Sequence, residues 1–328
     1  MRVTWAGRRP WARAVAASLA AIICAAATAQ EFPNRPIHLV VPSSAGNVAD
    51  LVARTLAAPM AKVLGQPVVV ENIAGAGGIT GTDKVVRSPK DGYTIALASS
   101  NHAINPSIFK SMPFDSLKDI APISVVGTTP LVLVAHPSVP AKDVRELMAL
   151  VKGRPGQLNY GSAGNGTVLH LAGVLLLSEA GIEIAHVPYK GFAPMLNDLL
   201  GGQIQLAFAG VATVAGHVRS GKLVALGLST PQRSAVLPDV PTLAESGVPG
   251  YSFDAWLALI GPAGLPAAVI DRLHAAARTA LATPEVQEIF AAQGLISVGS
   301  SPDAATRFFR SEIDKHAKLV KRSGATIE

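Results

Sequence analysis

The sequence predicts an α/β protein built of two similar units, and three observations support this prediction. Short apolar runs rich in β-branched residues alternate with stretches of helical periodicity, a pattern that indicates parallel strands joined by crossover helices. The pattern begins near residue 37 and starts afresh near residue 131. The 328 residues are also enough for two domains of roughly 150 residues each. We therefore expect two domains, each a mostly parallel sheet flanked by helices.

The first unit is predicted from five segments. Residues 37–41 are apolar and favour a strand, and residues 48–64 place Leu, Val, Thr and Met side chains on one helical face. Residues 68–70 are three valines and predict a second strand. A glycine-rich turn separates them from a helix that starts near residue 80, and residues 94–98 follow as a third strand.

The second unit has the same order. A strand over residues 131–134 precedes a helix that residues 139–143 open and that extends to about residue 152. A strand at residues 158–160 and a glycine-rich turn lead into a helix over residues 168–180. Three further apolar runs are predicted as short strands, at residues 184–187, 204–208 and 223–228.

The tail after residue 253 predicts helices and no third unit. One helix is expected over residues 266–281, and Ser301-Pro302-Asp303 opens another, since serine and proline suit the N-cap and the first helical position. We expect the tail to pack on the first unit. Domain one is then residues 30–129 plus 254–328, and domain two is residues 130–253. The chain crosses twice between them, which forms a two-strand hinge.

The first 29 residues have the composition of an export signal. They contain four arginines and no acidic residue, then an apolar stretch at residues 14–27, and they end in Ala27-Thr28-Ala29 before Gln30. This order is typical of a cleaved secretory signal peptide, whereas a membrane anchor needs an apolar run of about 20 residues. We expect cleavage near Ala29 and an exported, soluble product.

Charge and cysteine content exclude several classes of protein. Four of the 28 basic residues lie in the signal, which leaves 24 against 22 acidic residues and a formal charge of +2. That balance gives no basis for binding nucleic acid. The single cysteine excludes a disulfide framework and a site of several thiolates for a metal.

Four loops of small residues stand between predicted strands and helices, at residues 42–47, 74–78, 99–102 and 161–167. Glycine permits a tight turn in any such loop, but amides at a helix N-terminus also bind anions, and four such loops favour binding. In open α/β sheets, ligands sit beyond the carboxyl ends of the strands, where these loops lie. The candidate ligand-binding residues are Ser43, Ser44, Ala45, Gly46, Asn47, Asp50, Gly77, Gly78, Asn101, Ser162, Ala163, Gly164, Asn165, Thr167, His170, Lys190, Phe208 and Ala209.

Sharper motifs fail at defined positions. The turn from Gly75 to Thr80 lacks the last glycine of a dinucleotide fingerprint, and the loop ending at Thr167 lacks the lysine of a phosphate loop. The eight histidines do not approach metal-ligand spacing, and no loop holds a close pair of carboxylates. We expect no metal, no cofactor and no catalytic residue. The alternative is an exported α/β hydrolase acting through Ser43 or Ser44, although the first glycine of its nucleophile elbow is missing.

Three candidate residues have two interpretations each. Asp50 either contacts ligand or stabilises the first turn of its helix. His170 either reaches the cleft or packs one turn into its helix. Lys190 either complements an anionic ligand or is a solvated loop residue.

The sequence resembles the tripartite tricarboxylate transporter substrate-binding proteins, the Bug family of periplasmic receptors. The matching stretches cover nearly all of the mature chain in order: residues 36–50, 65–72, 75–78, 91–93, 160–167, 186–191 and 237–242. The resemblance implies a type II-like periplasmic-binding-protein fold that closes around a small carboxylate. It also implies a monomer, with membrane transporter subunits or a sensor as partners. By this resemblance, the loops that bind the carboxylate are residues 43–47 and 162–167.

Two departures from the family pattern bear on the ligand. Asn47-Val48 replaces a glycine followed by serine or threonine, and Ala209-Gly210 stands where Asp-Asn is frequent. The loss of an acid from the cleft removes a partner for a ligand ammonium group. We therefore expect a di-, tri- or aromatic carboxylate without an amino group. A scaffold with a degenerate cleft is a further alternative.

Overall fold

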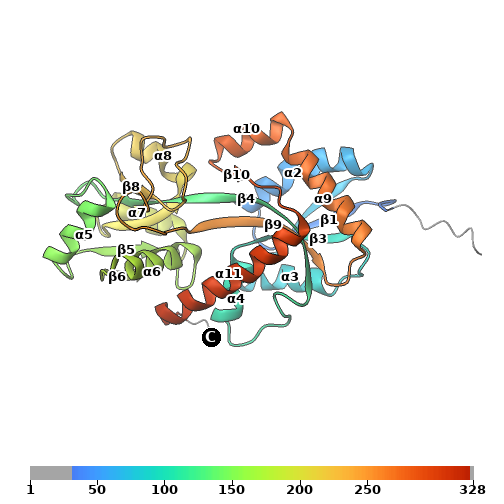
Figure 1. Cartoon of the computed structure of the whole chain (residues 1–328), viewed down its shortest axis with the longest axis horizontal. Coiled ribbons are helices and arrows are strands. Elements are labelled where there is room, and N and C mark those ends of the chain that lie inside the picture. Colours follow the sequence, from blue (N-terminus) through green and yellow to red (C-terminus); the bar gives the residue numbers. More distant parts are fainter. Residues whose placement is uncertain (1–31, 326–328) are drawn as a thin grey trace, which may run out of the picture.

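Strands and helices alternate along residues 32–325, the part of the chain that the computed structural model describes (Figure 1). The signal peptide predicted for residues 1–29 lies outside this part. Within residues 32–325, no helix combines the length and the apolar character needed to cross a bilayer. The expected α/β class is confirmed, with a mixed sheet that extends through both units.

The first unit has three parallel strands at its centre. β1 (Ile37–Val41) pairs with β2 (Val68–Asn72) on one side and with β3 (Thr94–Ser99) on the other. β9 (Asp254–Pro262) then joins β3 in antiparallel orientation. The helices of this unit are α2 (Val48–Leu64), α3 (Ile79–Val86), α4 (Asn101–Ile108), α9 (Ala267–Leu281) and α10 (Pro284–Ala292), with a 3-10 turn at Ala76–Gly78.

The second unit repeats the parallel arrangement. β5 (Asn159–Ser162) pairs in parallel with β6 (Ala185–Pro188) at the sheet edge and with β7 (Leu206–Gly210). β8 (Val224–Leu228) pairs with β4 on a separate branch of the sheet. The helices are α5 (Val144–Gly153), α6 (Val168–Ala180), α7 (Phe192–Leu200) and α8 (Val211–Arg219).

β4 (Ile120–Ala135) joins the two units as one strand of 16 residues. Its first part pairs with β9 in antiparallel orientation, from Ile120 opposite Pro262 to Pro130 opposite Asp254. Its last part, from Leu131, pairs with β7 and β8. β4 and β9 therefore run side by side between the units, as Figure 1 shows.

The last helix, α11 (Pro302–Ser323), packs on both units. Ser301 caps it by accepting a hydrogen bond from the Ala304 N–H. Phe309 lies in a buried cluster with Trp256 and residues of β3. Leu319, near the other end, belongs to a cluster formed mainly by the second unit. The tail was expected on the first unit, but a helix this long extends across to the second.

α2 shows how the sequence sets the bounds of an element. Asn47 caps its start, and Gly65 ends it in a left-handed conformation (φ 73°). Val52, Leu56 and Met60 are fully buried on its inner face, where each such side chain contributes about 1.5–3 kcal/mol.

The predicted strand at residues 131–134 is only the end of β4. Pro122, Ser124, Thr128, Thr129 and Pro130 interrupt the apolar pattern upstream, although the backbone there is extended and paired with β9. The register shifts twice along this pairing, which accommodates these residues. The apolar pattern therefore predicted only the last part of this strand.

Candidate functional site

The first candidate loop joins β1 to α2 and is shaped by its own side chains. Asn47 Nδ2 donates hydrogen bonds to Ser43 Oγ (2.7 Å) and to the Ser44 carbonyl oxygen (2.9 Å). Asn47 Oδ1 accepts one from the N–H of Asp50 at 3.0 Å. Gly46 has a φ of 84°, which other residues rarely adopt. The loop is exposed from Ser44 to Asn47, so its backbone is open to a ligand.

Asp50 stabilises this loop from the first turn of α2. Its Oδ2 accepts a hydrogen bond from the Gly46 N–H at 2.9 Å, and its Oδ1 lies 3.0 Å from Arg54 Nε. The bond from Gly46 and the contact with Arg54 hold the pKa of the Asp50 carboxyl below its ordinary value. Of the two roles that the sequence left open, these contacts support stabilisation of the turn.

The end of β2 and the glycine turn support the first loop. Asn72 Nδ2 donates to the Ser43 carbonyl oxygen at 3.4 Å, and Arg54 Nη2 donates to Asn72 Oδ1 at 3.0 Å. Gly78 packs closely against Pro42 at the start of the loop. A Cβ atom at Gly78 would lie only 3.0 Å from the Pro42 carbonyl oxygen.

α4 connects the glycine turn to the second unit. It begins at Asn101, which is half-buried, and its Asn105 donates from Nδ2 to the Gly77 carbonyl oxygen at 3.1 Å. Ile108, at the other end of α4, fills the space beside Gly166 that a Cβ atom would need. The second candidate loop is therefore in direct contact with the first unit.

The second candidate loop joins β5 to α6 and repeats the construction of the first. Thr167 caps α6: its Oγ1 accepts from the His170 N–H at 3.4 Å and donates to the Gly164 carbonyl oxygen at 2.8 Å. Gly166 has a φ of 72°, and its N–H donates to His170 Nδ1 at 3.0 Å. Asn165 is exposed at the tip.

Two histidines stack beneath the second loop. The rings of His170 and His186 are 4.0 Å apart at an interplanar angle of 11°, and Tyr160 stacks on His186 at 4.8 Å. His186 Nε2 lies 2.7 Å from the hydroxyl of Ser162, which is fully buried. Burial, and secondarily the neighbouring His186, lowers the pKa of His170 to about 4; burial also lowers that of His186 and raises that of Tyr160.

The remaining predicted residues lie in different surroundings. Lys190 is exposed, on the loop before α7. Phe208 and Ala209 are buried in β7, at 1% and 0% exposure, and Phe208 stacks on Tyr251. The Ala163 carbonyl oxygen accepts a hydrogen bond from the loop after β6, which fixes the start of the second loop.

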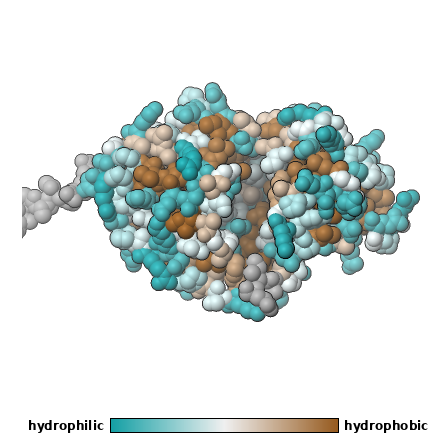
Figure 2. All heavy atoms as spheres, turned by 180° about the vertical axis from the view of Figure 1, so that it is seen from behind, coloured by the Kyte–Doolittle hydropathy of each residue, from teal (hydrophilic) through white to brown (hydrophobic). Residues whose placement is uncertain are grey.

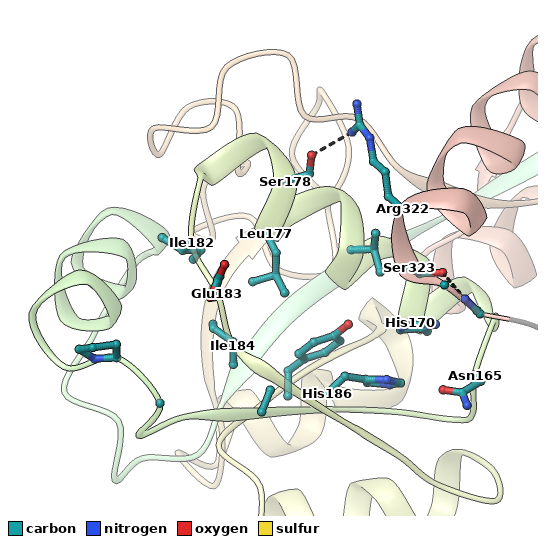
Figure 3. A pocket seen from close by; sticks show the side chains of 17 residues that line it. Asn165, His170, Leu177, Ser178, Ile182, Glu183, Ile184, His186, Arg322 and Ser323 are labelled. Atoms are coloured by element: carbon teal, nitrogen blue, oxygen red, sulfur yellow. Dashed lines mark hydrogen bonds between the residues drawn. The ribbon is translucent and has the colours of Figure 1, made fainter.

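The surface is hollowed in two places. Figure 2 shows a hollow between the two units with hydrophobic residues inside it. A separate cavity of about 1010 Å³ lies in the second unit, between α6, β6 and the end of α11. Figure 3 shows His170 and His186 on one side of this cavity, with Leu177 and Ile184 on another.

Comparison with known proteins decides the family. Residues 52–325 match the tripartite tricarboxylate transporter family receptor (TctC). This chain is a member of that receptor family. It is also 39% identical to protein BugT of Bordetella pertussis over 308 residues, which are 93% of this chain and 94% of BugT.

Solved structures of similar proteins have the same fold. Periplasmic binding protein BugD is 34% identical and superposes with a TM-score of 0.74, covering 90% of this chain and 100% of BugD. Rpa4515 of R. palustris, solved with adipate, is 31% identical with a TM-score of 0.77 over 90% of this chain and 100% of that protein. MatC of Rhodopseudomonas palustris, solved with bound malate, is 31% identical with a TM-score of 0.73 over 88% and 100%. The resemblance stated from the sequence is confirmed, and these relatives imply a periplasmic location.

TctC membership also decides between receptor and hydrolase. The family consists of substrate-binding receptors, so the expectation of a protein without enzymatic activity is confirmed. The geometry agrees, because the Ser43 hydroxyl accepts from Asn47, and no histidine within residues 32–325 is hydrogen-bonded to Ser43 or Ser44. In the same residues, no cluster of three or more His, Cys, Asp or Glu side chains is placed to hold a metal ion.

Sequence reasoning missed four residues that shape the loops of this receptor: Arg54, Asn72, Tyr160 and His186. Arg54 stands four residues after Asp50 in the same helix, and this spacing is a signal that could have found it. Asn72 and His186 approach the loops from the neighbouring strands β2 and β6, where only the sheet register brings them close. Tyr160 lies on β5 and stacks on His186 across that register. The sequence carries no local signal for such contacts.

Proposed function

We propose that this receptor captures a small carboxylate between the loop at residues 43–47 and the loop at residues 162–167. The observation that carries the proposal is the common construction of these loops. Each follows the first parallel strand of its unit, and each has a left-handed glycine before the N-cap of a helix. Backbone amides and the helix dipole favour an anion at such a position.

The ligand is proposed to be a di-, tri- or aromatic carboxylate without an amino group. Two relatives were solved with malate and adipate, both dicarboxylates. Neither loop contains an arginine or a lysine, so amides and hydroxyls would provide the hydrogen bonds to the carboxylates. Ala209-Gly210 offers no acid to a ligand ammonium group.

Closure of two domains would complete the site. We place domain one at residues 30–129 plus 254–328 and domain two at residues 130–253, with β4 and β9 as the hinge. Closure around the ligand removes water and strengthens the charge-assisted hydrogen bonds. The signal peptide would be cleaved near Ala29, and the closed monomer would deliver its ligand to a tripartite tricarboxylate-type transporter.

A thermal-shift screen tests this function. The exported protein is unfolded and refolded to remove carried-over ligand, then heated with carboxylates that do or do not carry amino groups or rings. A ligand at about 100 times its dissociation constant adds roughly 2.7 kcal/mol to the free energy of unfolding, which raises the melting temperature by several degrees. We expect shifts from a few related acids without amino groups.

Asn47→Ala tests whether the first loop binds the ligand, because it removes the side chain whose hydrogen bonds organise that loop. It should abolish the ligand-induced shift, whereas Asn197→Ala, at an exposed position of α7, should leave it unchanged. Stronger shifts from aspartate or glutamate than from any acid without an amino group would contradict the ligand class. No shift from any acid would favour a degenerate cleft.

A further inference from the structure

His170 and His186 together hold both ends of the second loop. The Gly166 N–H donates to His170 Nδ1 at 3.0 Å, and the Ser162 hydroxyl lies 2.7 Å from His186 Nε2. The two rings stack at 4.0 Å, so each restricts the position of the other. His170 is 4% exposed, which keeps its ring within the fold.

The hydrogen bond from Gly166 defines which nitrogen of His170 carries the proton. Nδ1 of His170 accepts from a backbone N–H, so this nitrogen carries no proton and the ring is uncharged, with its proton on Nε2. The Ser162 hydroxyl donates to the Gly164 carbonyl oxygen and accepts from the Gly164 N–H. Ser162 Oγ also lies 2.7 Å from His186 Nε2, and the tautomer of His186 sets which of these two atoms donates.

Few charged groups face this pair. The cavity beside the two rings is lined by Tyr160 from β5. Glu183 from the loop before β6 and Arg322 from α11 also line it (Figure 3). Arg322 donates to Ser178 at 2.9 Å and lies 3.9 Å from Glu179, so its charge is directed toward α6. A charge on His170 would lie against the other imidazole with no ion-paired carboxylate in contact with its ring.

We propose that His170 and His186 are positioning residues of the second loop. Uncharged His170 holds Gly166, and His186 holds Ser162, so that protonation of His170 frees one end of the loop and weakens ligand binding. His170 then acts on the ligand through the loop backbone. The effect on ligand binding rests on the proposed function, whereas the effect on the loop does not.

Imidazole nitrogen NMR tests the loop without any ligand. At pH 7, we expect His170 to show an unprotonated Nδ1 and a protonated Nε2. The Gly166 amide resonance should titrate together with His170, with a midpoint near pH 4. A proton on Nδ1 at pH 7, or a Gly166 amide indifferent to the titration of His170, would overturn the proposal.

Two substitutions separate hydrogen bonding from packing. His170→Asn keeps an uncharged acceptor, and Asp50 demonstrates in the first loop that a side chain of this length reaches the N–H four residues back. His170→Leu fills space but accepts no hydrogen bond. His217→Asn, on α8, is the control that removes a histidine remote from the loop.

Binding is measured at pH 7.5 with malate, adipate and the other acids of the panel, on folded variants verified by circular dichroism. His170→Leu should weaken the binding of the best acid by about fivefold to tenfold, the effect of one lost hydrogen bond. His170→Asn and the control should stay within about twofold. Equal losses in both His170 variants would overturn the proposal. If no acid binds the wild-type protein, the proposed function fails, and the Gly166 titration still decides the role of His170.

Discussion

The two candidate loops have the same backbone construction, but the side chain that stabilises it is charged in the first loop and uncharged in the second. In both, a left-handed glycine donates its N–H to the side chain four residues later, at 2.9 Å from Gly46 to Asp50 and at 3.0 Å from Gly166 to His170. The first acceptor is a carboxylate with Arg54 beside it, and the second is an uncharged imidazole. The same backbone shape can thus be held by an ion or by a neutral base. The imidazole loses its acceptor when it takes up a proton, which burial shifts to a pKa of about 4.

The largest expected difference lies between the two glycines. Gly166→Ala combines a disfavoured φ with a collision against Ile108, whereas Gly46→Ala meets open space and keeps only the disfavoured φ. We expect a loss of about 2–5 kcal/mol in the free energy of unfolding for Gly166→Ala and about 1–2 kcal/mol for Gly46→Ala. Urea unfolding measures both.

Gly216→Ala serves as the control for the glycine pair. It lies in α8 with an ordinary φ and open space around its Cβ position, so alanine should stabilise it slightly. Equal costs at Gly46 and Gly166 would mean that α4 does not press on the second loop.

The next effect is on the pH dependence of stability. The pKa of His170 is about 4 in the folded protein against 6.5 when unfolded, so unfolding takes up a proton between these values. The stability from His170 is full above pH 6.5 and declines toward pH 4, by up to about 3 kcal/mol. His170→Asn should reduce this decline in urea titrations at pH 7 and pH 4.5.

Other buried groups also titrate in this pH range, so the free energy of unfolding of each variant must be compared with that of the wild type at the same pH. Burial also lowers the pKa of His102 to about 4, and it raises that of Asp254 to about 7. The Asp254 contribution has the opposite sign, since it is full below the unfolded pKa and is lost as pH rises through 7. If the stability of His170→Asn has the same pH dependence as that of the wild type, the pKa of His170 in the folded protein is not lowered. The imidazole would then be solvated, or already charged in the folded protein at pH 4.5.

The smallest effects are expected at the helix caps. Thr167→Ala removes one cap and should cost about 1 kcal/mol, and Asn47→Ala should cost slightly more because Asn47 also bonds Ser43 and Ser44. Ser301→Ala, at the cap of α11, should cost a similar amount without changing ligand affinity. An equal loss of affinity in all three variants, measured by calorimetry, would assign the effect to general destabilisation.

Local patterns predicted most of the fold. The strand at residues 37–41 and the helices at residues 48–64 and 168–180 were placed at their observed bounds, because each has a strong periodic pattern with a cap or a glycine at its end. β9 was expected only as a hinge crossing near residue 253, and most of β4 was not predicted as a strand. Their partners lie more than 100 residues away in the sequence at some positions, and prolines and hydroxyl residues interrupt β4.

The candidate loops were predictable from glycine, serine and asparagine between a strand and a helix, but their internal contacts were not. Whether a side chain such as Asp50 or His170 points toward a ligand or back to the loop depends on one torsion angle, which composition does not determine. The His186 contact depends on the register between β5 and β6. Such pairings exist only once the sheet has formed.

The uninterrupted course of β4 has a consequence for how the protein melts. This strand forms backbone hydrogen bonds with strands of both units, and α11 adds side chains to the cores of both units. Neither unit can lose its structure without removing pairing partners from the other. A chain of two lobes would therefore unfold in a single calorimetric transition, with equal van't Hoff and calorimetric enthalpies.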